Sequence, residues 1–255
     1  MSKLTTQIIT ILLFSFFSCF NLHAAETDPV VEAYSCNYLE GKNQQDLNSA
    51  IEFWQKGMGK LNSEAMKNYF GVVLNPINSS FGADFYWLGS NTNLNTWAAG
   101  NADYFGSKVG QDADKKFAKM SKCTSNLFFS KPLYEGLTPA TDGTGAVIMT
   151  AACTLKEGKT LQNAMAVEGP RIAELVANKA QTSVYRLVPY IANTPYDLLY
   201  LIVHSDLKAF ASAGTRQITS EAWMATNEAF TSTMHCESGL FNSQVVHLPA
   251  VAAQN

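Results

Sequence analysis

The sequence has few charged residues and no excess of basic ones. Only 15% of the 255 residues are charged, and 21 acidic side chains slightly outnumber 18 basic ones. A protein that binds nucleic acid or an anionic membrane surface needs a concentrated basic face. The basic residues here are scattered along the chain. The composition therefore argues against both kinds of partner.

Several catalytic signatures are also missing. The sequence contains no phosphate-binding glycine loop followed by Lys-Ser or Lys-Thr, and no Gly-x-Ser-x-Gly elbow. Its four histidines include no His-x-x-x-His pair, and no two carboxylates stand out as a glycosidase pair. The sequence therefore predicts no metal site, and it contains no motif that names a reaction.

Long hydrophobic runs are absent except at the N-terminus. There an apolar run from Ile8 to Phe17 follows Lys3 and precedes a stretch of small residues. This pattern predicts a secretory signal peptide over residues 1–25. A retained membrane anchor is one alternative, but the run is shorter than the roughly 20 residues of a spanning helix. Lipid attachment at Cys19 is another, which its flanking residues fit poorly. We therefore expect a periplasmic or secreted protein without stable membrane insertion.

Four of the five cysteines remain after removal of the signal peptide: Cys36, Cys123, Cys153 and Cys236. An even number of cysteines in an exported protein indicates disulfides. A zinc site is the competing interpretation, although the close paired spacing of zinc ligands is missing. Taken alone, four cysteines leave three pairings open.

An internal repeat selects one of these pairings. Residues 69–131 align without a gap with residues 182–244 at a constant offset of 113. Upstream, a Cys followed by Glu-Gly-Lys occurs in both copies, at an offset of 117. Each copy thus holds one early and one late cysteine. The repeat therefore predicts two disulfides, Cys36–Cys123 and Cys153–Cys236.

Each copy is predicted to contain a strand, a helix, two strands, a helix and a strand. Hydrophobic periodicity places the first copy's strands at 30–39, 69–74, 84–88 and 126–129, and its helices at 45–61 and 94–120. A turn-rich stretch is expected at 75–80, and breaks near Gly106 and Gly110.

The second copy follows the same order. Its expected strands are 146–155, 182–188, 197–203 and 240–248, and its expected helices are 160–180 and 207–234. Asp206 is expected to cap the second of these helices, as Asn93 caps the helix at 94–120 in the first copy. Pro170 should kink or split the first of these helices. The predicted domains are repeats at 26–134 and 146–250, a Gly- and Thr-containing linker at 135–145 and a tail at 251–255.

This order of elements is the ferredoxin-like plan, an α+β fold. In that plan the first strand lies between the third and the fourth, so its end lies beside the start of the fourth. Both predicted disulfides join these two places, if the late cysteines come just before the fourth strand. Each such sheet has helices on one face only. Two copies can therefore bury their bare faces against each other.

The Glu-Gly-Lys turns and the strand-to-helix passages 85–94 and 199–207 make the chain resemble a tandem, single-chain member of the dimeric α/β-barrel superfamily. That superfamily includes antibiotic-biosynthesis-type monooxygenases, NIPSNAP-like proteins, chlorite dismutases and dye-decolorising peroxidases. The resemblance rests on topology and covers almost all of the chain after the signal peptide. It implies a barrel with antiparallel sheets and a monomer that is a pseudo-dimer.

The resemblance also points to polar residues at strand ends, near the mouth of a cavity. His204 ends the third strand of the second copy, and Asn91 is its counterpart in the first. His204 is therefore the candidate catalytic residue, as a haem ligand, a general base or a hydrogen-bond donor. A surface histidine in a loop is the alternative interpretation.

Two further residues are candidates for ligand binding. Arg186 lies in an apolar strand and could bind an anionic ligand within the barrel, or it could reach to water from an edge strand. Trp87 belongs to an aromatic-rich first copy that could line a cavity for a flat or apolar ligand. Ordinary core packing is the alternative for Trp87.

These observations favour an exported protein that binds a small apolar or aromatic molecule in the barrel. An enzyme is the first alternative, either a cofactor-free monooxygenase-like one that uses His204 or a haem-dependent one. A structural or interaction module with a packed barrel is the second. No cofactor is predicted, because the axial and distal groups that haem chemistry needs cannot be matched.

Overall fold

The computed structural model describes residues 28–137 and 145–249. The predicted signal peptide and the tail at 251–255 lie outside the described residues, as do positions 138–144 of the expected linker. Within the described ranges, none of the helices combines the length and apolarity needed to cross a membrane.

The first repeat contains four strands and four helices in the described residues. In chain order they are β1 (Val30–Tyr38), α1 (Gln44–Met58), α2 (Glu64–Lys67), β2 (Phe70–Ser79), β3 (Phe85–Asn91), α3 (Leu94–Gly106), α4 (Lys108–Ala118) and β4 (Ser121–Glu135). The second repeat follows the same order without a counterpart of α2. Its elements are β5 (Val147–Leu155), α5 (Leu161–Ala177), β6 (Thr182–Ile191), β7 (Leu198–His204), α6 (Leu207–Thr219), α7 (Glu221–Thr233) and β8 (Met234–His247).

Helix starts are encoded locally and in the same way in both repeats. Asn43 and Thr160 cap α1 and α5, and each takes part in a capping box with the third residue of its helix. Asn93 and Asp206 accept a backbone hydrogen bond at the starts of α3 and α6. These last two caps confirm the positions that the sequence predicted.

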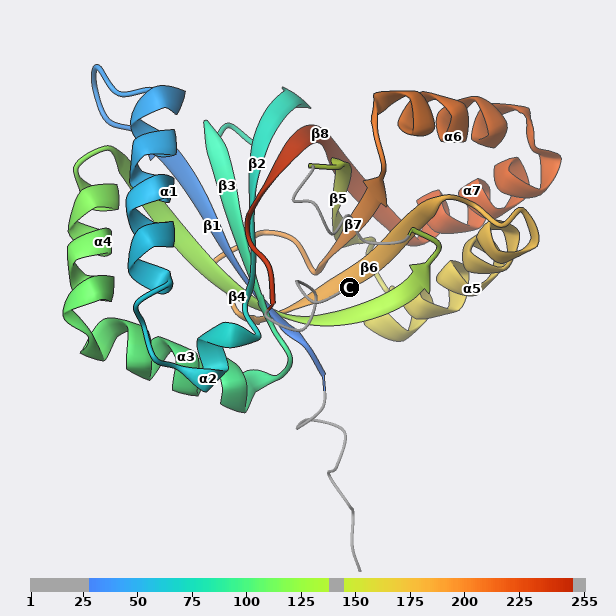
Figure 1. Ribbon diagram of the computed structural model, residues 1–255. Coiled ribbons are helices and arrows are strands. Elements are labelled where there is room, and N and C mark those ends of the chain that lie inside the picture. Colours follow the sequence, from blue (N-terminus) through green and yellow to red (C-terminus); the bar gives the residue numbers. More distant parts are fainter. Residues whose placement is uncertain (1–27, 138–144, 250–255) are drawn as a thin grey trace, which may run out of the picture.

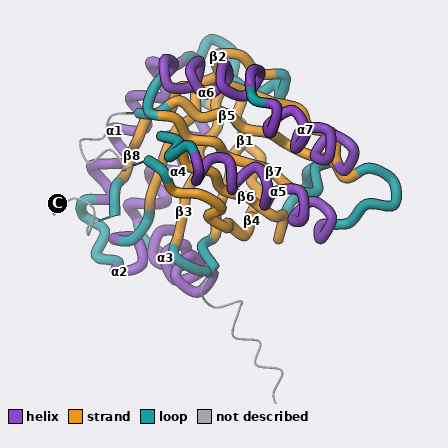
Figure 2. The backbone as a smooth tube through the Cα atoms, turned by 90° about the vertical axis from the view of Figure 1, so that its right-hand side faces the viewer, coloured by secondary structure: helices purple, strands orange, loops and turns teal. Residues whose placement is uncertain are grey.

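The eight strands form one closed antiparallel barrel in the order β1-β3-β2-β8-β5-β7-β6-β4. Within each repeat the order is the ferredoxin-like one, since β1 lies between β3 and β4, and β5 lies between β7 and β8. The pairs β2–β8 and β4–β6 join the two repeats. Helices α1 to α4 cover one side of the barrel and α5 to α7 the opposite side (Figures 1 and 2). The predicted fold class is confirmed.

Both predicted disulfides are present, which contradicts the zinc interpretation of the cysteines. Cys36 is bonded to Cys123 and Cys153 to Cys236. In each pair the two cysteines are direct neighbours in the register of adjacent strands. The late cysteines lie inside β4 and β8 rather than ahead of the last strand, because both strands begin earlier than predicted.

The differences from the predicted elements arise mostly where the barrel closes. β2 continues through the expected turn at 75–80 as far as Ser79, because these residues pair with β8. β4 extends to Glu135 because its second half pairs with β6. Neighbours from the other repeat thus supply hydrogen bonds that local sequence cannot reveal.

The helices also differ in detail from the prediction. α5 runs through Pro170 as one helix, so the expected split does not occur. The break between α3 and α4 falls at Gly106 and Ser107, as expected for Gly106. Gly110 does not break the chain; it lies in the first turn of α4, where its N–H is bonded to the Ser107 hydroxyl.

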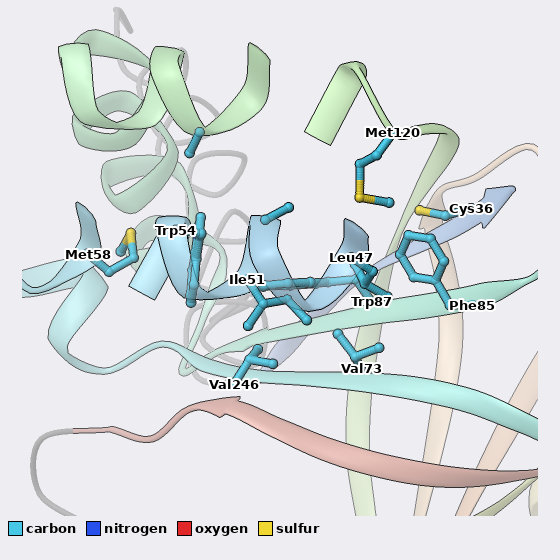
Figure 3. Close-up of a cluster of buried hydrophobic side chains, with 12 residues drawn as sticks. Cys36, Leu47, Ile51, Trp54, Met58, Val73, Phe85, Trp87, Met120 and Val246 are labelled. Atoms are coloured by element: carbon cyan, nitrogen blue, oxygen red, sulfur yellow. The ribbon is translucent and has the colours of Figure 1, made fainter. Parts of the chain in front are cut away.

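Apolar side chains fill both faces of the barrel wall. The interior holds Val31, Val72, Leu74, Phe128, Ile148, Leu187 and Phe241. On the helix side of the first repeat, the apolar stripe of α1 packs against Val73, Phe85 and Trp87 of the sheet (Figure 3). The same arrangement in the second repeat places Ala164 of α5 against Leu198 and Tyr200.

Candidate functional site

Each repeat contains a cavity between the barrel wall and its own helices. The first has a volume of about 360 Å³ and is lined by strands β1, β3 and β4 and by helices α1 to α4. The second has a volume of about 210 Å³ and is lined by strands β4 to β8 and helices α5 to α7. Both cavities thus lie outside the barrel and not inside it, where a ligand was expected.

Strand alternation decides which side chains face a cavity. Successive residues of a strand point to opposite faces. In β1, Glu32, Tyr34 and Cys36 face the helices and line the first cavity. Val31 and Ala33 of the same strand pack in the barrel interior. The aromatic and acidic residues of this strand therefore share one face.

Nine of the 19 residues that line the first cavity are aromatic. Trp87 meets Trp54 and Phe117 edge to face, with centroids 5.0 and 5.7 Å apart and interplanar angles of 80° and 81°. The indole N–H of Trp87 donates to the Tyr69 hydroxyl at 2.6 Å. The sequence placed Trp87 at a cavity or in the core, and the structure places it at both.

Glu32 is a functional candidate that the sequence reading missed. Its carboxylate accepts hydrogen bonds from the Tyr34 hydroxyl at 2.8 Å and from the Trp97 indole N–H at 3.1 Å. Burial and the neighbouring Glu32 charge raise the pKa of Tyr34, so the phenol keeps its proton and remains a donor. The available signal was the single charged residue of the strand, at the same alternate positions as Tyr34 and Cys36.

Two further polar groups face this cavity. The Tyr104 hydroxyl donates to Asp114 at 3.0 Å, and burial raises the pKa of Asp114 against the opposing effect of this hydrogen bond. Asn91 is only 4% exposed, and its side-chain oxygen has no hydrogen-bond partner among the described residues. No Lys, Arg or His occurs among the described residues that line the cavity.

The second cavity is built around an ion pair. Glu168 of α5 accepts hydrogen bonds from the Arg186 guanidinium at 2.5 Å and from the Tyr200 hydroxyl at 2.8 Å. Burial raises the pKa of Glu168, while Tyr200 and Arg186 act in the opposite direction. Arg186 is 8% exposed and points toward the helices. Both predictions for Arg186 are therefore wrong: its side chain does not reach to water, and it does not face the barrel interior.

A second arginine stacks on aromatic rings in this cavity. The Arg171 guanidinium carbon lies 3.8 Å from the centroid of Phe230 and 4.7 Å from that of Trp223. Its Nη2 donates to the Asn227 side-chain oxygen at 2.5 Å. Burial lowers the pKa of Arg171 to about 10, which leaves it charged at neutral pH.

His204 lines the second cavity and is 4% exposed, so it is not a surface loop residue. The Thr182 hydroxyl donates its proton to the carbonyl oxygen of Val203 at 2.8 Å. That hydroxyl therefore accepts from His204 Nδ1 at 3.2 Å. Burial, helped by Arg216, lowers the pKa of His204. The imidazole is neutral at pH 7, and Nε2 carries its free lone pair.

Neither a family model nor a curated protein matches the chain by sequence. Solved structures do match. A candidate monooxygenase from Lactobacillus acidophilus NCFM has a TM-score of 0.57 at 13% identity, over 85% of this chain and 94% of that one. An anthrone oxidase-like protein has a TM-score of 0.56 at 10% identity, over 88% of this chain and 95% of that one. A candidate chlorite dismutase has a TM-score of 0.52 at 10% identity, over 89% of this chain and 98% of that one. The chain therefore has the dimeric α/β-barrel fold in single-chain form.

The identities are too low to transfer an activity to this single-chain α/β barrel. Its four predicted site residues form two groups rather than one. Asn91 and Trp87 line the first cavity, whereas His204 lines the second and Arg186 lies in the ion pair beside it. A ligand-binding role stays a prediction for each of them.

Proposed function

We propose that the protein binds a small, mainly apolar or aromatic molecule in the cavity of the first repeat. The observation that carries this proposal is the composition of the cavity wall. A volume of about 360 Å³ lies within the range of ligand pockets, which are mostly apolar with a few placed polar groups. Here the apolar part is aromatic, and Glu32 and Asn91 supply polar groups at one end of the sheet.

The aromatic walls favour a flat or compact apolar body. Trp87 meets both Trp54 and Phe117 at nearly right angles, so a bound molecule would touch rings on more than one side. Tyr69 and Trp87 satisfy each other through a hydrogen bond. Their polar atoms therefore do not have to be desolvated again when an apolar ligand enters.

Export and a monomeric state belong to the same proposal. The two disulfides support export, because such bonds persist in oxidising compartments. The periplasmic or secreted location rests in addition on the predicted signal peptide. One chain closes the whole barrel, which supports a monomer in which the two repeats take the place of two subunits.

A cofactor-free oxidation is the second candidate function, and His204 is the observation that favours it. Its neutral imidazole is held through Nδ1 and leaves Nε2 free to accept a proton. Replacement of His204 by Ala should abolish turnover of a quinol or phenol substrate found by screening. Unchanged turnover would remove His204 from the mechanism.

Haem finds less support, since His204 is the only histidine among the described lining residues of either cavity and its cavity is small.

Native mass spectrometry of protein isolated from its own host tests the binding proposal. We expect additional mass that is lost on denaturation, and displacement of the neutral fluorescent probe N-phenyl-1-naphthylamine by the released molecule. Ser121 lines the first cavity, and its counterpart Met234 is buried in the second repeat. The variant Ser121→Met should therefore lose much of the bound mass. Absence of both bound mass and probe binding in the native chain would contradict the proposal.

A further inference from the structure

The first cavity is acidic and contains no compensating cation of its own. Glu32 and Asp114 both line it, and neither forms an ion pair among the described residues. Each carboxylate instead accepts hydrogen bonds from neutral donors, namely Tyr34 and Trp97 for Glu32 and Tyr104 for Asp114. Carboxylates in partly buried surroundings are stabilised by a cation, so the cavity lacks the charge that would complete it.

The unsatisfied hydrogen-bonding atom in this cavity is also an acceptor. The side-chain oxygen of Asn91 is buried and has no partner among the described residues. Buried polar atoms are nearly always paired in native proteins, and an exception calls for a bound molecule or water. Together with the two carboxylates, Asn91 makes the cavity a set of acceptors that a ligand with N–H groups or positive charge would satisfy.

The second repeat shows how this fold holds a cation at the corresponding place. There the Arg171 guanidinium stacks on Phe230 and donates to Asn227. At the offset of 113, Phe230 and Asn227 correspond to Phe117 and Asp114 of the first repeat. The first repeat therefore keeps the aromatic ring and replaces the neutral acceptor by a carboxylate. The position of Arg171 itself, at the offset of 117, is taken by Trp54.

We propose that the ligand of the first cavity is an organic cation, an amine or quaternary ammonium on an apolar or aromatic body. This inference rests on the proposed binding function and narrows its ligand class. The cationic nitrogen lies against the aromatic faces and near Glu32 and Asp114, since ring faces attract cations within about 6 Å. The apolar body occupies the remaining space between the sheet and helices α3 and α4.

A pair of isosteric probes separates charge from shape. Phenyltrimethylammonium and tert-butylbenzene differ in one atom, nitrogen against carbon, and hence in charge. Binding is followed by quenching of tryptophan fluorescence, because Trp54, Trp87 and Trp97 line the cavity. We expect the cation to bind about tenfold tighter or more, since a desolvated cation–π contact and a nearby carboxylate both act on the charged probe only.

Two variants and a control complete the experiment. Glu32→Gln and Asp114→Asn should each weaken binding of the cation severalfold or more and leave tert-butylbenzene within about twofold of the native affinity. Asp114→Asn copies the residue of the second repeat, so it keeps a side chain that this fold accepts. The exposed Glu40→Gln should change neither probe, and thermal denaturation should confirm that every variant is folded.

The possible outcomes are distinguishable. Equal affinities for the two probes, or tighter binding of tert-butylbenzene, would overturn the cationic ligand and leave the binding function intact. Unchanged binding of the cation in both carboxylate variants would overturn the proposed role of Glu32 and Asp114. Failure of both probes to quench the native protein would count against the binding function itself.

Discussion

The two repeats share one frame and differ in what lies between sheet and helices. In the first repeat, Ile51 and Val73 belong to one buried apolar cluster. At the corresponding places in the second repeat, Glu168 and Arg186 form a buried ion pair. The larger cavity therefore accompanies an apolar wall with uncompensated carboxylates, and the smaller cavity accompanies internal charge pairing. The same topology thus supports two sites of opposite character.

This difference indicates that the repeats are not equally available to a ligand. In the second cavity the protein supplies charges of both signs, since Arg186 pairs with Glu168 and Arg171 stacks on Phe230, although the Nε atoms of both arginines have no hydrogen-bond partner among the described residues. In the first cavity the charged and polar groups depend on neutral donors or have no partner. A cationic ligand therefore gains more in the first cavity, whose described lining residues include no Lys, Arg or His, than in the second, which contains arginines of its own.

Removal of either disulfide should give the largest effect and should be the same in both repeats. The two bonds span 87 and 83 residues, and a loop of this length corresponds to about 4.5 kcal/mol on the chain-entropy model. We expect Cys36→Ala/Cys123→Ala and Cys153→Ala/Cys236→Ala to lower the free energy of unfolding by similar amounts, measured by urea denaturation. A large difference between them would show that the repeats do not contribute equally to stability.

Removal of one partner of the ion pair should lower the free energy of unfolding more than replacement of both partners. Glu168→Ile leaves Arg186 buried without its partner, which should destabilise the fold by about 3–5 kcal/mol. The double variant Glu168→Ile/Arg186→Val copies the first repeat and should recover most of that loss. The double variant should remain about 1 kcal/mol less stable than the native protein, because the Tyr200 hydroxyl loses its acceptor. The same urea titrations measure both variants.

Cation–aromatic stacking should matter in the second cavity and hardly at the surface. Arg171→Met removes a partly buried guanidinium from two rings and should lower stability by about 1–2 kcal/mol. Lys116→Met removes an exposed ammonium that lies 5.4 Å from the Phe53 centroid, and about 0.5 kcal/mol or less is expected. Thermal and urea denaturation measure both variants. If Arg171→Met and Lys116→Met lose the same stability, burial does not strengthen the Arg171 contacts.

The smallest expected effect concerns acid sensitivity at His204, whose counterpart in the first repeat is Asn91. Burial lowers the pKa of folded His204 below its ordinary value of 6.5, so the unfolded chain binds more protons. Stability should therefore be full above about pH 6.5 and fall as the pH drops toward the folded pKa. His247, whose pKa is lowered by burial too, acts with the same sign.

The variant His204→Asn, which copies the first repeat, should flatten this part of the stability–pH curve. His235→Asn at an exposed position is its control and should leave the curve unchanged. Urea midpoints at intervals from pH 7.5 to 5 measure the slope. An unaltered slope in His204→Asn would mean that His204 does not contribute to the acid sensitivity.

The order of elements and the disulfides could be predicted because their signals are local or repeated. Apolar periodicity marks α1, and the caps Asn93 and Asp206 mark the starts of α3 and α6. The repeat then fixed the cysteine pairing. The far ends of β2 and β4 could not be predicted, since they pair with strands of the other repeat. The early starts of β4 and β8 were missed as well, and these pair with β1 and β5 of their own repeats.

The candidate site was only partly accessible from the sequence. Trp87 and Asn91 could be selected as aromatic and strand-end residues, but their cavity was expected on the wrong face of the sheet. Strand alternation contained the missing information, because Glu32 and Tyr34 share the parity of the disulfide-bonded Cys36. The Glu168–Arg186 pair could not be found in this way. It joins a helix to a strand, and no periodicity links the two.

Closure of the barrel by a single chain has a consequence for how such a site can change. In a symmetric homodimer, each substitution occurs in both subunits at once, so a charge introduced into one cavity also enters the other. Here β2 meets β8 and β4 meets β6 within one polypeptide. Each repeat can therefore acquire a substitution alone. One repeat can keep the residues that stabilise the barrel while the residues of the other cavity change to bind a different ligand.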